Sequence, residues 1–170
     1  MRDINLLRLR NLSCRICDEA YEKVVNRGRE NERVNIFRRV KIPEHATNLV
    51  QSSTSPVPGK GSYDARYMFI GESPGEWEDE NGEAFGGRSG KYLKEKLLKQ
   101  LAKIDVNLCW FTNVIKCHPR KNRNPYNSEI AACWPWLRRE IDLVEPEVIF
   151  TIGLIATKLL LPSQTSMKAC

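Results

Sequence analysis

Four of the six cysteines have a spacing that suits a metal centre. Cys14 and Cys17 form a C-x2-C pair, which lets two thiolates meet at one metal, and Cys117 and Cys133 lie far along the chain. Zinc ribbons usually keep their two halves closer together, and a [4Fe-4S] cluster also takes four thiolates. The spacing leaves three interpretations open: an iron-sulfur cluster, a zinc site, or ordinary buried thiols at Cys117 and Cys133.

Two glycine-rich stretches, GESPGEWE at 71–78 and NGEAFGGRSGK at 81–91, could hold a ligand. Glycines let the backbone approach a ligand closely, and Ser89 to Lys91 open a predicted helix whose amino end can receive a phosphate. The G-x4-G-K-[ST] spacing of a P-loop is absent. Phe85 lies among these glycines, where its ring can either stack on a flat ligand or pack in the core.

The same stretches carry many carboxylates. We interpret four of them as solvated surface charge: Glu76, Asp79, Glu80 and Glu83.

Asn113, in FTNVIKCHPRKNRNP, ends a predicted strand. Its amide offers both a donor and an acceptor, which can read the edge of a nucleobase or cap a turn. Basic residues follow it, and they suit phosphate contacts or a solvated surface: Lys116, His118, Arg120, Lys121 and Arg123.

The composition favours an anionic partner. Lysine and arginine number 27 against 21 acidic residues, which gives a formal charge of +6, and a nucleic acid is the natural candidate. No apolar run approaches the roughly 20 residues of a membrane span, and residues 1–11 lack a secretory signal's apolar centre. We therefore expect a cytoplasmic protein with no membrane contact, in which thiols stay reduced.

Strands and helices are expected to alternate through most of the chain. Apolar runs predict strands at 67–70, 108–115 and 148–152, and Cys109 is predicted to be a core residue. Helical patterns fall at 91–104, at 130–144 despite Pro135, and from 154 to 161. In the first helix, the leucines Leu93, Leu97, Leu98 and Leu101 share one face with Ile104, and lysines lie opposite.

This alternation predicts a three-layer α/β/α domain with a central parallel sheet. Ligands of such sheets bind beyond the carboxyl ends of the strands, where both signature loops fall. We expect one domain over 1–170, with a loop at 50–62 and a charged insertion at about 18–56.

Several segments in the correct order resemble the iron-sulfur, family 4 type of uracil-DNA glycosylase. The matching segments are VPGKG at 57–61, MFIGESPGEWED at 68–79, AFGGRSGK at 84–91, TNVIKCHPRKNRNP at 112–125, EIAAC at 129–133 and EPEVIFTIGLIATKLL at 145–160. The resemblance implies a uracil-DNA glycosylase-like fold, base flipping and excision of uracil from single- or double-stranded DNA.

The resemblance also assigns roles to residues. Cys14, Cys17, Cys117 and Cys133 match the four cluster ligands, which favours [4Fe-4S] over zinc. Phe85 matches the residue that stacks on the flipped uracil, Asn113 the one that reads its edge, and Glu72 and Glu78 acidic positions associated with activity. The implied uracil-binding set is Gly71, Glu72, Ser73, Phe85 and Asn113. The residues suited to contact DNA phosphates are Ser89, Lys91, Arg120 and Arg123.

Ser73 occupies the place of a water-activating aspartate in better-known uracil glycosylases, but the apparent relatives lack that group too. The two departures from the family are a longer charged insertion between Cys17 and Val57 and a chain shortened at the C-terminus, without the family's later His-Pro-Ser motif. The expected sheet therefore has an open edge that a protein partner could cover. A non-catalytic iron-sulfur relative that binds DNA or docks to a protein is the alternative function.

Overall fold

The computed structural model describes residues 53–54 and 56–161, and its centre is a four-stranded sheet. The strands are β1 (Lys60–Gly61), β2 (Tyr67–Gly71), β3 (Cys109–Asn113) and β4 (Val148–Thr151), in the order β1-β3-β2-β4. β2 pairs in parallel with both β3 and β4, which confirms the predicted parallel core.

The short strand β1 departs from the predicted loop over 50–62, because it pairs antiparallel with β3. Gly61 explains how it comes so close: a Cβ there would lie 2.1 Å from the carbonyl oxygen of Cys109. Only a residue without a side chain allows this approach.

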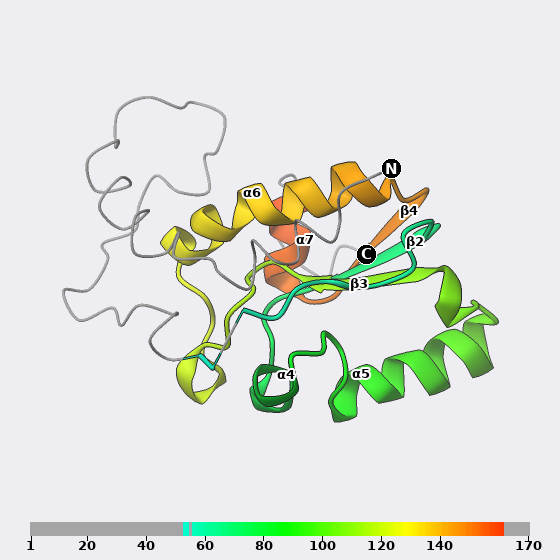
Figure 1. Cartoon of the computed structure of the whole chain (residues 1–170), viewed down its shortest axis with the longest axis horizontal. Helices are drawn as coiled ribbons and strands as arrows, with labels where there is room; N and C mark the ends of the chain where they lie inside the picture. Colours follow the sequence, from blue (N-terminus) through cyan, green and yellow to red (C-terminus); the bar gives the residue numbers. More distant parts are fainter. Residues whose placement is uncertain (1–52, 55, 162–170) are drawn as a thin grey trace.

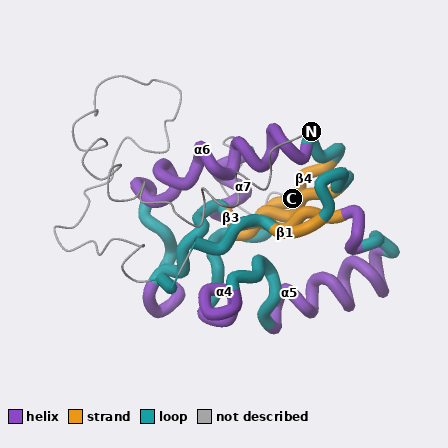
Figure 2. The backbone as a smooth tube through the Cα atoms, viewed as in Figure 1, coloured by secondary structure: helices purple, strands orange, loops and turns teal. Residues whose placement is uncertain are grey.

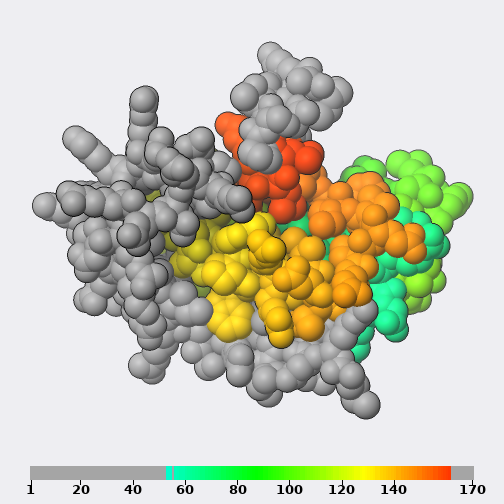
Figure 3. Space-filling view, turned by 90° about the horizontal axis from the view of Figure 1, so that it is seen from above, coloured from blue at the N-terminus to red at the C-terminus, as the bar shows by residue number. Residues whose placement is uncertain are grey.

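Helices cover both faces of the sheet. They are α4 (Glu76–Asn81), α5 (Arg88–Tyr92), η2 (Leu93–Ala102), η3 (Val106–Leu108), η4 (Arg120–Asn122), α6 (Asn127–Val144) and α7 (Leu154–Leu160). In Figures 1 and 2, α4 and α5 lie on one side of the sheet and α6 and α7 on the other. Figure 3 shows α6 and α7 next to each other on the face seen from above. The three-layer prediction is thus confirmed.

Two apolar clusters hold these layers together. On the α6 side, Met68, Ile70 and Trp110 pack with residues of α6 and α7. On the α5 side, Phe69 stacks between Phe111 of β3 and Phe150 of β4, with ring centroids 5.3 Å and 4.8 Å apart. Residues of a strand alternate between faces, so each strand contributes to both faces of the sheet.

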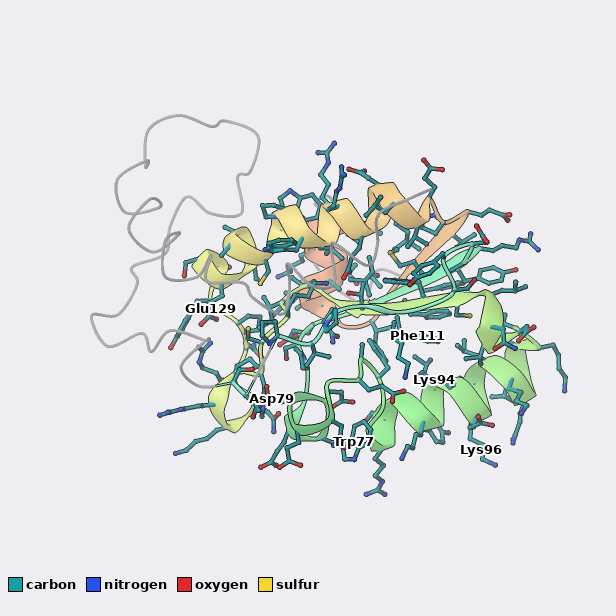
Figure 4. The ribbon with its side chains drawn as sticks, in the orientation of Figure 1. Trp77, Asp79, Lys94, Lys96, Phe111 and Glu129 are labelled. Carbon is teal, nitrogen blue, oxygen red and sulfur yellow. The ribbon has the colours of Figure 1, made fainter. Side chains whose placement is uncertain are left out.

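The helix predicted over 91–104 has a different inward face from the one we expected. Its second part, η2, is a π-helix, in which residues five apart come onto one side. Leu98 is buried, whereas Leu101 is 74% exposed, so the leucine face predicted from a 3.6-residue period is wrong. Lys94 points toward the sheet, with its Nζ 4.7 Å from the Phe111 ring centroid, and Lys96 points away (Figure 4).

Other predictions about the core hold. Cys109 is fully buried, and burial followed by the nearby Asp105 charge raises the pKa of its thiol to about 11. Pro135 lies inside α6 on its exposed side.

No helix among the described residues is long and apolar enough to cross a membrane. The predicted insertion at 18–56 falls almost entirely outside the described residues.

Among the residues that the structure describes, β4 forms one end of the strand order. Val148, Ile149 and Phe150 on this strand are exposed by 42%, 37% and 38%. An edge strand with exposed apolar side chains is open to pairing with a further strand.

Candidate active site

The site forms where the parallel strands β2 and β3 end together. Gly71 and Asn113, their last residues, are direct partners in the register. The two segments that follow these strands are also hydrogen-bonded to each other. The Val114 amide donates to the Gly71 carbonyl at 2.9 Å, and the Ile115 amide donates to the Glu72 carbonyl at 3.1 Å. Both signature loops therefore start side by side at the carboxyl ends of β2 and β3, as the topology predicted.

Gly71, Asn113 and Phe85 converge at this point. A Cβ on Gly71 would lie 2.5 Å from Oδ1 of Asn113 and 2.8 Å from Cζ of Phe85. The Asn113 amide oxygen and the edge of the Phe85 ring therefore both lie against the backbone of Gly71, an approach that is possible because residue 71 has no side chain. Three residues that are distant in the sequence meet here.

Phe85 packs in the core, which is one of the two roles that its sequence context left open. Its ring packs against Phe111, with centroids 5.7 Å apart, and belongs to the cluster on the α5 side. It is only half-buried, and its backbone adopts a left-handed φ of 55°. Gly90 packs against the Phe85 backbone, since a Cβ there would lie 2.1 Å from the Phe85 carbonyl oxygen. This contact helps hold the ring in its place.

Glu78 joins the two glycine-rich loops. Its carboxylate accepts hydrogen bonds from the Gly75 amide at 3.2 Å and from the Gly87 amide at 2.9 Å. This geometry makes Glu78 a support for the loop that carries Phe85, because both carboxylate oxygens are already engaged.

Replacing Glu78 with alanine is expected to destabilise the protein by about 1–3 kcal/mol, because two partly buried amides lose their acceptor. Urea unfolding measures the change, and Glu80→Ala, at an exposed position of the same helix, is the matched control. Equal stability of the two variants would contradict the bridging role.

Glu72 and Ser73 directly follow β2 and are half-buried. Burial raises the pKa of the Glu72 carboxyl. Among the described residues no hydrogen bond holds this carboxyl, in contrast to that of Glu78. Of the two acidic positions associated with activity, Glu72 is therefore the one whose carboxyl is available to a ligand or to water, whereas that of Glu78 is engaged.

Asp79 is not the solvated surface charge we expected. It is buried, and its carboxylate accepts hydrogen bonds from the Ser53 hydroxyl and from the Thr54 amide at 2.8 Å. Burial by itself favours the neutral acid, but the hydrogen bonds from Ser53 and Thr54 and the nearby His118 outweigh it and lower the pKa of Asp79. The carboxylate attaches the segment before β1 to α4.

The lowered pKa of Asp79 predicts that the free energy of unfolding depends on pH. The unfolded chain takes up the proton at a higher pH than the folded protein, so the stabilisation from Asp79 is present at neutral pH. It is lost as the pH falls through about 4 toward the folded-state pKa. Unfolding free energies of wild type and Asp79→Asn should converge at low pH, whereas Asp142→Asn, on the outer side of α6, should show no such convergence.

The basic residues after Asn113 have different environments. Lys116 is buried, so its prediction as a phosphate contact is wrong. Arg123 forms an ion pair with Glu129 at 2.6 Å, and its guanidinium lies 4.0 Å from the Tyr126 ring centroid. Arg120 is exposed. On α5, two further predicted phosphate contacts are exposed: Ser89 and Lys91.

Sequence reasoning missed the partners of Lys116. Its ammonium donates to Glu140 of α6 at 2.8 Å and to Thr112 at 2.6 Å, and both partners are buried. A signal was available, because Glu140 lies three residues after the buried Leu137 and four before the buried Val144. A carboxylate on the apolar stripe of a helix requires a buried partner.

The structure describes two of the four predicted metal ligands, Cys117 and Cys133. Cys117 and Cys133 are both 4% exposed and belong to the same packed cluster beneath α6. Both thiols are thus buried on the α6 side of the sheet. Cys14 and Cys17 lie outside the described residues, and within the described ranges no three metal-binding side chains come together.

The chain is similar to several known proteins. Residues 58–169 match the model of the uracil DNA glycosylase superfamily. The chain is 44% identical over 110 residues to the type-4 uracil-DNA glycosylase of Sulfurisphaera tokodaii, which covers 65% of this chain and 50% of that protein. It is 42% identical over 104 residues to the Saccharolobus solfataricus protein of the same name, covering 61% and 48%. For that of Thermotoga maritima the identity is 42% over 112 residues, covering 65% and 57%. The chain thus spans about half the length of the curated relatives it matches.

Proposed function

The chain belongs to the uracil DNA glycosylase superfamily, and we propose on this basis that it hydrolyses the N-glycosidic bond of uracil in DNA. The observation that carries the proposal is the convergence of Asn113 and Phe85 at Gly71. An aromatic ring and an amide meet at the ends of two parallel strands, where such sheets bind ligands. This is the minimum needed to hold a flat base and read its edge.

Asn113 selects uracil by hydrogen-bond complementarity. Its amide N–H donates to the O4 carbonyl of uracil while its Oδ1 accepts from N3–H. Cytosine has an amino group at C4 and no proton on N3, so both contacts would be mismatched. Reading this edge requires the nucleotide to leave the base stack, and Phe85 supplies the face on which the flipped base rests.

Bond cleavage separates charge, and the site has groups suited to both signs. The bond between the sugar C1′ and uracil N1 breaks and its electron pair goes to the base, on which negative charge develops. The oxygen of water bonds to C1′, and the proton that this water loses neutralises the departed uracil. Asn113 and the backbone amides of Glu72 and Ser73 stabilise that charge on the base oxygens, because Pro74 has no amide proton and the Gly75 amide already donates to Glu78. Glu72 supplies negative charge near the sugar or orients the water, because no hydrogen bond within the described part of the chain engages its carboxyl, whereas that of Glu78 is engaged.

The proposed cofactor is a [4Fe-4S] cluster held by Cys14, Cys17, Cys117 and Cys133, in the reducing cytoplasm. Burial of Cys117 and Cys133 in one cluster supports it, and so does the similarity to type-4 proteins. When bound, the cluster would link the amino-terminal pair to the loop after β3. Anaerobic purification should yield a brown protein with broad absorbance near about 400 nm, and a colourless, zinc-loaded protein would contradict the assignment.

Exposed cations are proposed to hold the DNA backbone: Lys91 with Ser89 on α5, and Arg120 after β3. Arg123 is less suited, because Glu129 already neutralises its charge. Replacing Arg120 with glutamine should weaken DNA binding and reduce the slope of log affinity against log salt by about 0.7–0.9. Fluorescence anisotropy at several salt concentrations measures this slope. Arg138→Gln, at an exposed position of α6, should leave it unchanged.

A gel-based excision assay on single- and double-stranded DNA containing one uracil tests the proposed reaction. Release of uracil should leave an abasic site that alkali cleaves. DNA binding without cleavage at enzyme excess would instead favour the non-catalytic alternative. The alternative includes a protein partner that binds β4. The exposed side chains of Val148, Ile149 and Phe150 on that strand support it.

A further inference from the structure

A buried ionic network lies directly behind the predicted base-reading residue. Lys116 and Glu140 have side chains only 3% and 2% exposed, and their Nζ and Oε2 atoms are 2.8 Å apart. The lysine ammonium has three protons to donate, and three acceptors receive them: Glu140 Oε2, Thr112 Oγ1 at 2.6 Å and the Asn113 carbonyl at 2.9 Å. The cation is therefore fully satisfied without water.

Glu140 extends the network to further elements. Its Oε2 also accepts from the Thr112 hydroxyl at 2.5 Å, and its Oε1 accepts from the Gly59 amide at 3.1 Å. The segment before β1, the end of β3, the turn after it and helix α6 are thus joined at one carboxylate. No other ion pair among the described residues has both side chains this deeply buried.

The ionic network lies on one side of β3, and the side chains proposed to hold the base, Phe85 and Asn113, lie on the other. Thr112 faces α6 and Glu140, and the next side chain in a strand points to the other face. The Asn113 amide accordingly meets Gly71 and Phe85, while its main-chain carbonyl is held from behind by Lys116. The base-reading side chain is thus oriented by contacts that never touch the base.

Stability alone does not account for this arrangement. Removing two charges from water costs as much as, or more than, their attraction returns, and apolar residues of similar volume often stabilise a protein equally well. A fully connected polar network is instead suited to fixing one geometry.

We propose that Lys116 and Glu140 are positioning residues that orient Asn113 for reading the base. This inference rests on the proposed uracil excision. The buried pair should affect kcat, because the Asn113 amide must be correctly placed when negative charge develops on the base. It should have little effect on KM, because other residues contact the DNA backbone.

The test replaces both charges together, in Lys116→Met/Glu140→Leu, so that no single buried charge is left unpaired. We expect kcat to fall about 10- to 100-fold, with KM for uracil-containing DNA within about threefold of wild type, because a displacement of about 1 Å at a reacting group has such an effect. The matched control is Arg66→Gln/Glu147→Gln, which removes an ion pair whose side chains are 52% and 58% exposed and should leave both constants unchanged.

Crystal structures of wild type and the double variant supply a readout that does not need activity. The Asn113 amide should be displaced from Gly71 in the variant. An unchanged kcat or an undisplaced amide would overturn the inference. If the wild type excises no uracil, the proposed function fails, and the position of Asn113 alone then decides the inference.

A milder variant covers the case in which the double variant does not fold. Thr112→Val keeps the ion pair and the side-chain volume but removes the hydroxyl that links Lys116 to Glu140. It should lower kcat several-fold and shift Asn113 in the same direction. Wild-type kcat with Asn113 in its original place in Thr112→Val would equally overturn the inference.

Discussion

Replacing Asn113 with alanine should lower the rate of uracil excision about 100- to 1,000-fold, which is the largest effect we expect from one side chain. The amide lies at the strand end beside Gly71 and Phe85, where it offers both a donor and an acceptor to the base edge. Its removal takes away selection of the base and stabilisation of the leaving group together. Single-turnover excision from single-stranded DNA measures the loss.

Asn107→Ala is the matched control for this prediction. Asn107 is an exposed asparagine in η3, at the opposite end of β3, and the same substitution there should leave excision unchanged. DNA binding by Asn113→Ala should stay near that of wild type, because phosphate contacts dominate affinity. A rate within about threefold of wild type would exclude Asn113 from stabilising the departing base, because the loss of such a preorganised donor costs far more than that.

The sequence predicts that Gly71 and Asn113 meet because both lie at the ends of strands. Apolar runs locate β2 and β3, and parallel pairing then brings Gly71 and Asn113 together without knowledge of any side-chain contact. Phe85 could be placed near them only through the resemblance to known glycosylases. Its contact with Gly71 depends on a tight loop that packs Gly90 against its backbone.

The errors also have physical causes. The predicted inward face of η2 is wrong because a π-helix changes the period, which exposes Leu101 and turns Lys94 inward. Asp79 and Lys116 are buried, contrary to prediction, because composition does not reveal a buried partner distant in sequence. Long-range pairing of polar groups is the information that local patterns lack.

Replacing Gly71 with alanine should reduce excision about 100-fold while leaving the chain folded, since a displacement of about 1 Å at the groups that hold the base is enough for this loss. The added methyl would lie 2.5 Å from Oδ1 of Asn113 and 2.8 Å from Cζ of Phe85, so both must move away from that position. Overpacking at a buried strand end should also destabilise the protein by about 1–3 kcal/mol. Single-turnover excision and urea unfolding measure the two effects.

Gly82→Ala separates these two effects. Gly82 has a φ of 66°, and an added Cβ there would meet no atom within 4 Å. The left-handed backbone makes alanine unfavourable by about 1 kcal/mol without disturbing any neighbour. Gly82→Ala should therefore lose stability and keep its excision rate, whereas Gly71→Ala should lose both. If Gly71→Ala excised uracil at the wild-type rate, the space between Asn113 and Phe85 would not be where the base binds, and the mechanism built on their convergence would be wrong.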